Sequence, residues 1–219
     1  MRFADKIFFQ NKGKKLTPFN RNYFFFGTVL VILVNIGLFA ALGLGENWSY
    51  RLYSPEIAWE DFVPLNLLAA LTSSFGHLDW SHVLMNAFAF LGCGLYLERR
   101  IGTLKLLTLT LFFAFFSAGM LAVVYNQADG GVGYSGVNYA FIGYIVLDYL
   151  ISLPTERGKF QVLYGGAAVL CLVLGSFVDS AAASIAAYPV NLMYNVAHYS
   201  GLFAGVATWL FEKVIKRLA

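Results

Sequence analysis

The sequence predicts an all-α integral membrane protein with six transmembrane helices and both termini in the cytoplasm. Hydrophobic residues make up 59% of the 219 residues and charged residues only 12%, which is too little charge to cover a soluble domain. Six apolar runs come close to the roughly 20 residues that a helix needs to cross a bilayer. Lysine and arginine lie almost wholly between alternate runs, as the positive-inside rule requires.

The apolar runs define the expected spans. They are 23–44, 82–98, 104–125, 135–153, 160–178 and 197–213. The first run is long for a signal peptide and five more follow it, so we expect a retained anchor. Because no linker-like tract or clear repeat interrupts the chain, we expect one membrane domain, 23–215, between a basic cytoplasmic tail, 1–22, and a short cytoplasmic tail, 216–219.

The basic residues predict the orientation of these spans. With six crossings, every lysine and arginine except Arg51 falls on one side of the membrane. Since cytoplasmic loops are enriched in these residues, the even-numbered helices should run from the outer side inward. The compact architecture favours a bacterial plasma membrane. The net charge is +3, and the basic residues form short clusters at helix ends, which does not suggest a nucleic-acid partner.

The first outer segment, about 45–80, is long and mixes tryptophan and tyrosine with acidic residues. Amphipathic aromatic side chains favour the headgroup region, so we expect short helices in the membrane interface. An ordinary solvated loop is the alternative. The two cysteines, Cys93 and Cys171, lie inside apolar runs without a metal-ligand partner nearby in sequence. We therefore expect packing roles for them, and neither a metal site nor a cofactor.

Polar residues mark the outer starts of the even-numbered helices. The three histidines are His77, His82 and His198, and Asn86 follows His82 by one helical turn. Ser135 begins the fourth run and His198 begins the sixth. Ionisable groups inside a membrane are costly and are usually functional. These residues therefore predict a polar site within the bundle.

Helix length places these groups in one layer. At 1.5 Å per residue, the next basic residue lies about 25 Å below His82, at most about 33 Å below Ser135 and about 22 Å below His198. The three helices run in the same direction. We therefore expect the three side chains to lie together, below the outer surface and above the midplane.

This layer has the groups of a serine hydrolase. A serine hydroxyl needs a base to remove its proton, and neutral histidine is the usual base. We predict Ser135 as the nucleophile and His198 as the base. The side chains of His82 and Asn86 and the backbone N–H of Ser135 are predicted to form an oxyanion hole. A plain helix-capping role for Ser135 is the alternative.

Small residues support close contact around Ser135. Gly133 and Gly136 allow a tight backbone before the fourth helix. Gly201 and Gly205 form a small face on the sixth helix that permits close helix packing. Tyr139, one turn after Ser135, is placed either to stack on the His198 ring or simply to pack. Asp148, the acidic residue in this helix, lies more than three turns below Ser135, so we predict a dyad rather than a triad.

These motifs resemble those of the rhomboid intramembrane proteases. Segment 76–86 resembles the family's His-x4-His-x3-Asn motif, 133–140 its Gly-x-Ser-Gly motif, and 197–205 its Ala-His-x-x-Gly-x-x-x-Gly pattern. Segment 98–102 is similar to the family's sequence after the second helix, and the resemblance runs from about 76 to 210 in the expected order. A Trp-Arg pair common before the first motif histidine is absent from 66–72, which affects the expected packing of the outer loop.

The resemblance implies a six-transmembrane-helix rhomboid-like bundle and a serine endopeptidase that acts on transmembrane protein substrates in the lipid bilayer. It assigns nucleophile and base to Ser135 and His198 and the oxyanion hole to His82, Asn86 and the Ser135 amide. It implies stacking for Tyr139 and a structural, hydrogen-bonding role for His77. It also implies that the loop at 179–196 covers the site and that the fifth helix is a side entrance.

Three other readings stay open at this point. An inactive rhomboid-like binding protein would share the fold, although such relatives usually lack the serine or the histidine. A small transporter or channel would explain the intramembrane histidines but not the Gly-x-Ser-Gly segment. A dedicated processing enzyme for C-terminal sorting tails would share the chemistry and differ only in its substrate.

Overall fold

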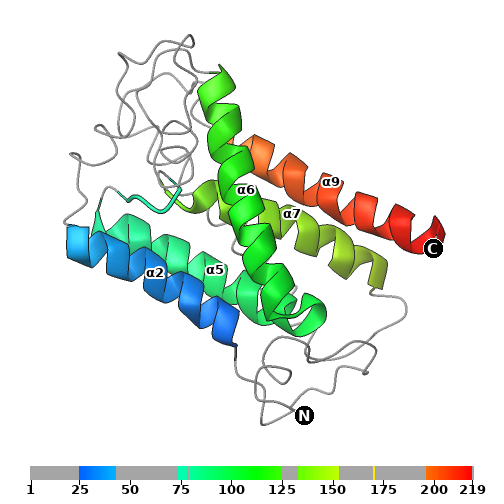
Figure 1. Ribbon diagram of the computed structural model, residues 1–219, viewed down its shortest axis with the longest axis horizontal. Coiled ribbons are helices and arrows are strands. Elements are labelled where there is room, and N and C mark those ends of the chain that lie inside the picture. The colour runs from blue at the N-terminus through cyan, green and yellow to red at the C-terminus, as the bar shows by residue number, and fades with distance from the viewer. Residues whose placement is uncertain are drawn as a thin grey trace.

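The computed structural model describes residues 25–42, 74–77, 79–124, 133–152, 170 and 196–218. Secondary structure in these ranges is helical (Figure 1). The helices are α2 (Phe26–Leu42), α5 (Trp80–Ile101), α6 (Thr103–Val124), α7 (Ser135–Ser152) and α9 (Val196–Leu218). They correspond to the first, second, third, fourth and sixth expected spans. The fifth span, except for Leu170, lies outside the described residues, as do the outer segment 45–80 and the loop 179–196 apart from their ends.

Several helix ends differ from the expected boundaries by a few residues, and two of these differences have a clear physical reason. α5 begins at Trp80 because Asp79 caps it: its carboxylate accepts the backbone N–H of His82 at 2.8 Å. α9 continues to Leu218, so the expected tail 216–219 is helical over most of its length. A basic helix end can extend into water beyond an apolar span, where hydropathy no longer marks its boundary.

Two of the described helices are long and apolar enough to cross a membrane by length and composition: α5, and α6 over Thr103–Met120. α2 and α7 are shorter apolar helices. Large apolar side chains are exposed on the outside of the bundle, among them Leu33, Phe88 and Phe203, each at least 60% exposed. Such faces suit lipid rather than water, and they agree with a helical membrane protein.

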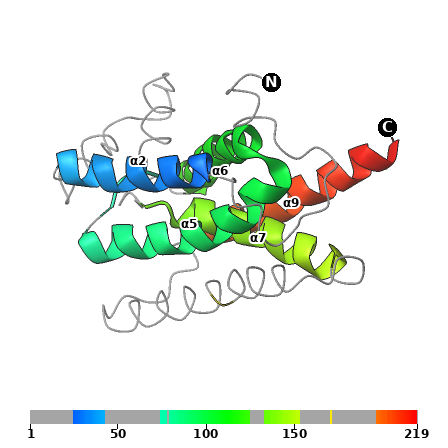
Figure 2. The same cartoon turned by 90° about the horizontal axis from the view of Figure 1, so that it is seen from below.

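α2 runs antiparallel to α5 (Figures 1 and 2). Glu98, near the end of α5, is fully buried and accepts hydrogen bonds from the N–H groups of Gly27 and Thr28, both at 2.8 Å. A carboxylate at a helix N-terminus satisfies amides that have no partner within the helix. At the other end of the pair, the rings of Phe39 and Trp80 pack edge to face with centroids 4.8 Å apart.

α7 and α9 run side by side in the same direction and form the most extensive contact between two described helices (Figures 1 and 2). Gly201 lies against the carbonyl oxygen of Gly136, and Gly205 lies against that of Ala140, so that neither glycine leaves room for a Cβ. A Cβ at Gly143 would lie 2.5 Å from a backbone oxygen of α9. Because these glycines have no side chain, α7 and α9 can approach each other closely.

An aromatic core joins α5, α6 and α7. The ring of Phe90 lies 5.3 Å from that of Tyr134 and 5.6 Å from that of Phe141, and Phe113 packs on Phe141 at 5.1 Å. Cys93 is fully buried in this core, as predicted for a packing residue; Cys171 lies outside the described residues. The core holds the start of α7 against α5.

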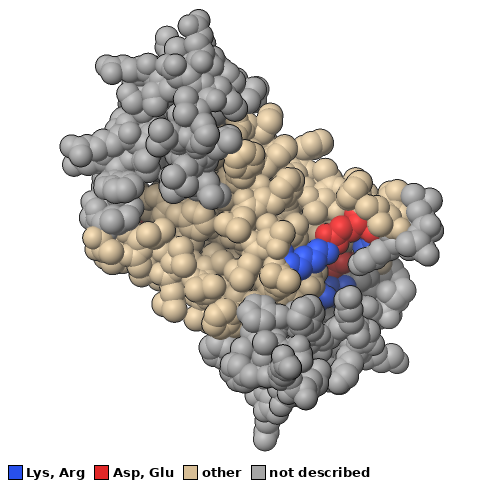
Figure 3. Space-filling view, in the orientation of Figure 1, with Lys and Arg blue, Asp and Glu red and all other residues tan. Residues whose placement is uncertain are grey.

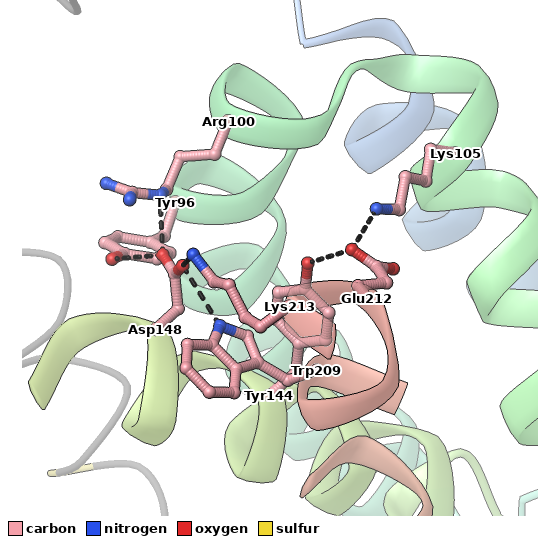
Figure 4. A network of polar contacts seen from close by, with 8 residues as sticks. All are labelled: Tyr96, Arg100, Lys105, Tyr144, Asp148, Trp209, Glu212 and Lys213. Carbon is pink, nitrogen blue, oxygen red and sulfur yellow. Dashed lines mark hydrogen bonds and ion pairs between the residues drawn. The ribbon is translucent and has the colours of Figure 1, made fainter. Parts of the chain in front are cut away.

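Charged groups gather at one end of the bundle. On the face shown in Figure 3 they lie together near the C-terminal half of α9, and the rest of the described surface in that view is uncharged. In the close-up of Figure 4, Asp148 of α7 forms an ion pair with Arg100 at 2.6 Å and accepts hydrogen bonds from Tyr96 and Trp209, each at 3.1 Å. This polar cluster ties together the ends of α5, α7 and α9.

Candidate active site

Ser135 and His198 meet at the opposite end of α7 and α9 from this cluster. Ser135 is the first residue of α7 and His198 the third of α9. The Nε2 atom of His198 lies 2.7 Å from the Oγ atom of Ser135, and His198 is buried. When the imidazole is neutral and Nε2 accepts, the hydroxyl donates this bond, and the proton can pass to the ring within hydrogen-bond reach.

The ring of Tyr139 stacks on the imidazole of His198. Their centroids lie 4.5 Å apart and the planes differ by 12°. Tyr139 is one turn beyond Ser135, so the face of α7 that presents the hydroxyl also presents this ring. Of the two arrangements that spacing alone left open, the structure contains the stacked one.

Close packing of the two helices sets the distance between Ser135 and His198. Gly136 follows Ser135 directly, and a Cβ there would lie 2.8 Å from the side chain of Ser117 and 3.2 Å from the carbonyl oxygen of Ala197. Ala197 directly precedes His198, and Gly201, one turn after Ala197, lies against Gly136. Glycine at these two positions therefore brings the starts of α7 and α9 together.

Gly133 brings α5 to the start of α7. Its φ of +130° is unfavourable for other residues. A Cβ on Gly133 would lie 2.7 Å from the ring nitrogen Nε2 of His82 and 3.7 Å from Nδ2 of Asn86. The backbone just before Ser135 therefore passes directly beside both side chains predicted for the oxyanion hole.

The first turn of α7 begins two residues after Gly133. The helix begins with the N–H of Asn138 donating to the carbonyl of Tyr134 at 3.1 Å. The N–H of Ser135 precedes this bond, in the part of a helix where amides have no acceptor within the helix. It is therefore available to a negative charge, which the helix N-terminus also favours.

Sequence reasoning missed Asn138, the third residue after Ser135. It is 3% exposed, and its Nδ2 atom donates to the backbone oxygen of Asn86 at 3.1 Å and to its side-chain Oδ1 at 3.0 Å. Asn86 in turn donates from Nδ2 to the carbonyl of His82 at 3.1 Å. A primary amide inside an apolar run, on the same helix as Ser135, was the available signal.

His77 lies behind His82 and is buried. Its Nδ1 atom is 3.2 Å from the carbonyl oxygen of Phe75, and its ring meets that of His82 edge to face at 5.0 Å. Burial, and secondly the neighbouring His82, lower the pKa of His77 to about 4. His77 is therefore neutral at physiological pH and donates from Nδ1 to the carbonyl.

Asp79 fixes the first turn of α5. Its carboxylate accepts the Ser81 hydroxyl at 2.5 Å and the backbone N–H of His82. These hydrogen bonds, with that from Ser81 the larger contribution, lower the pKa of Asp79. The cap therefore stays ionised and determines where α5 starts, nearly two turns before Asn86. Within the described ranges, no three histidine, cysteine or acidic side chains could jointly hold a metal ion.

Comparison with known proteins gives a consistent result. A sequence model described as Rhomboid domain matches residues 64–213. Proteins named Rhomboid protease GlpG from Yersinia pseudotuberculosis serotype I (strain IP32953) and Yersinia pestis (strain Pestoides F) are each 36% identical over 142 residues. That of Yersinia enterocolitica serotype O:8 / biotype 1B (strain NCTC 13174 / 8081) is 35% identical over 142 residues. Each alignment covers 62% of this chain and 45% of the relative, so the chain spans about half the length of these relatives.

Proposed function

The chain belongs to the rhomboid family, and on this premise we propose that it is a multi-pass membrane serine endopeptidase that cleaves transmembrane protein substrates. Ser135 and His198 form its catalytic dyad. The observation that carries the proposal is the 2.7 Å contact between Nε2 of His198 and Oγ of Ser135, two side chains from separate helices. A capping serine needs no such partner.

Acylation would begin with proton transfer from Ser135 to His198 as the hydroxyl attacks a substrate carbonyl. Negative charge then develops on the carbonyl oxygen. The side chains of His82 and Asn86 lie beside Gly133, two residues before Ser135, and with the Ser135 N–H they are the donors proposed for it. The protonated His198 next gives its proton to the leaving amine, and water with His198 as base releases the acyl group.

The position of the dyad suits a site reached from the outer side. The basic side chains Arg100, Lys105 and Lys213 belong to the far end of the helices, in or beside the cluster of Figure 4. By the positive-inside rule that end is cytoplasmic, as are both termini, and a bacterial plasma membrane would hold the bundle.

Substrates should be transmembrane segments that unwind easily. A helix hides its carbonyl groups in internal hydrogen bonds, and glycine, proline or polar residues weaken it. We therefore expect preferred cleavage in or next to such breaks. A dedicated enzyme for sorting tails would have the same dyad and would differ in accepting one class of tail.

The decisive experiment compares purified wild type, Ser135→Ala and His198→Ala on a single-span transmembrane reporter. Removing a member of a catalytic unit lowers kcat by at least about a thousandfold, so both variants should be inactive. A fluorophosphonate should label wild type and not Ser135→Ala. Equal cleavage by all three proteins would end the dyad assignment. Absence of labelling in a folded wild type would favour a rhomboid-like binding protein or a transporter.

A further inference from the structure

We infer that Asn138 is a positioning residue that holds the Asn86 amide with its nitrogen, rather than its oxygen, toward the oxyanion hole. The inference rests on the proposed function and adds a residue that acts through Asn86. A primary amide has an oxygen face and a nitrogen face of nearly equal shape. Only the nitrogen face can donate to an oxyanion. Some neighbour must therefore select the orientation.

The hydrogen bonds of Asn138 select the orientation in which the oxygen of the Asn86 amide faces Asn138. The backbone oxygen of Asn86 can only accept, so the atom of Asn138 that lies 3.1 Å from it must be the NH₂ nitrogen. The same nitrogen lies 3.0 Å from the side chain of Asn86, so the atom of Asn86 that faces it must be Oδ1. Its Nδ2 is consequently turned the other way.

The nitrogen of Asn86 is turned toward the reacting region. It donates one N–H to the carbonyl of His82 at 3.1 Å, and it lies 3.7 Å from the place where a Cβ on Gly133 would be. An NH₂ group has a second N–H. That hydrogen is the one available to an oxyanion formed at Ser135, two residues after Gly133.

Asn138 also links the two halves of the site. It is on α7, one turn after Ser135, whereas Asn86 is on α5. Its bonds to Asn86 therefore fix a donor of the oxyanion hole relative to the nucleophile through a single helical turn. Burial of Asn138 in an apolar bundle strengthens these bonds, because no water competes for them.

The test is a double-mutant cycle on the full chain in detergent, with the transmembrane reporter as substrate. Loss of an oxyanion donor lowers kcat by about 100-fold to 1,000-fold. We expect Asn138→Leu to lower kcat by about tenfold to 100-fold, since the amide of Asn86 then keeps only its bond to the His82 carbonyl and loses the donor that holds its oxygen. KM should stay within about twofold, because the uncharged ground-state carbonyl gains little from this donor. In an Asn86→Ala background, Asn138→Leu should have no further effect.

A merely structural asparagine would behave differently. Replacing it would lower the thermal midpoint. Any fold loss in kcat would be the same in the Asn86→Ala background as in wild type, so the two losses would multiply. Asn35→Leu is the matched control: Asn35 is also a buried helical asparagine, but it donates to Val31 one turn away on α2. That variant should keep the wild-type kcat. If Asn138→Leu does not fold, Asn138→Ala removes the same donor without adding bulk, and it should show the same loss of kcat.

The outcomes separate the two proposals. If wild type cleaves and labels but Asn138→Leu and Asn138→Ala both keep full kcat, the role of Asn138 is refuted and the dyad stands. Equal fold losses in the wild-type and Asn86→Ala backgrounds would also refute it. If wild type neither cleaves nor labels with fluorophosphonate, the proposed function fails and this inference fails with it.

Discussion

Single residues contact His198, the proposed base, and should affect how well it acts. The imidazole is held by Oγ of Ser135 on one edge and by the Tyr139 ring on one face. Behind the predicted oxyanion hole, His77 is buried and its ring contacts that of His82. Each of these contacts restricts the ring of His198 or of His82, and each can be removed by a separate substitution.

Removing the ring of Tyr139 should lower activity. Tyr139→Phe keeps the stacked ring and should retain kcat within about threefold, whereas Tyr139→Ala should lower it about tenfold, since an aromatic pair contributes about 0.5–1.5 kcal/mol. Reporter cleavage at saturating substrate measures both. If Tyr139→Ala cleaves as fast as wild type, the stack has no part in catalysis.

Stability should decrease in mild acid because of His77. Its pKa is about 4 in the folded protein and close to 6.5 in an unfolded chain. Between these values the unfolded chain binds the additional proton, so the free energy of unfolding falls as pH decreases from 6.5 toward 4, by at most about 3 kcal/mol. Above pH 6.5 this contribution is fully present.

Thermal unfolding in detergent at several pH values tests this prediction. His77→Gln lacks the titrating group, so its midpoint should vary less between pH 6.5 and 4.5 than that of wild type. Because His82 and Asp79 are close enough to affect the pKa of His77, they are left unchanged in both proteins. Parallel pH profiles for the two proteins would contradict the assignment.

At the scale of elements, the contact between α7 and α9 determines the distance between Ser135 and His198, the proposed dyad. Gly205 lies directly against the carbonyl of Ala140, so Gly205→Ala must push the two helices apart. A displacement of about 1 Å at a catalytic pair can lower kcat about 100-fold. We expect a loss of that order for Gly205→Ala in the cleavage assay.

Gly37→Ala is the control for this prediction. Gly37 is also in a helix, but a Cβ there would meet no described atom within 4 Å. Gly37→Ala should leave kcat unchanged and should not lower stability, because alanine favours a helix by about 0.5–1 kcal/mol over glycine. If both variants lose activity equally, the loss does not come from the contact between α7 and α9.

Over the whole molecule, the polar cluster around Asp148 and the proposed catalytic residues lie at opposite ends of the same helices. The cluster in Figure 4 joins α5, α7 and α9 through Asp148, and α6 through the ion pair of Lys105 with Glu212 at 2.5 Å. Tyr144 of α7 also donates to Glu212, at 3.0 Å. This network holds together the ends of the helices that carry Ser135, His198 and Asn86 at their other ends.

Asp148→Asn should therefore destabilise the protein without changing its chemistry. Breaking a buried ion pair costs about 3–5 kcal/mol, and both Asp148 and Arg100 are largely buried. The thermal midpoint should fall. Turnover per fluorophosphonate-labelled site should equal that of wild type. A lower turnover per labelled site would mean that Asp148 affects the dyad directly.

The sequence by itself determined the helical character of the described spans and which glycines lie between α7 and α9, and it predicted which residues carry the chemistry, because hydropathy, helical period and residue type are local properties. The five described helices coincide with five of the six expected spans to within a few residues. The dyad and oxyanion roles remain predictions, although the structure places these side chains together.

Only the tertiary structure decided how these groups are oriented. Asn138 meets Asn86 across 52 residues of sequence, and Asp148 meets Trp209 across 61. Such contacts depend on how far each helix is rotated about its axis and on how closely its neighbours approach. Those quantities follow from the packing of all the side chains in the bundle together, so no local pattern around Ser135 could have shown that Asn138 donates to Asn86.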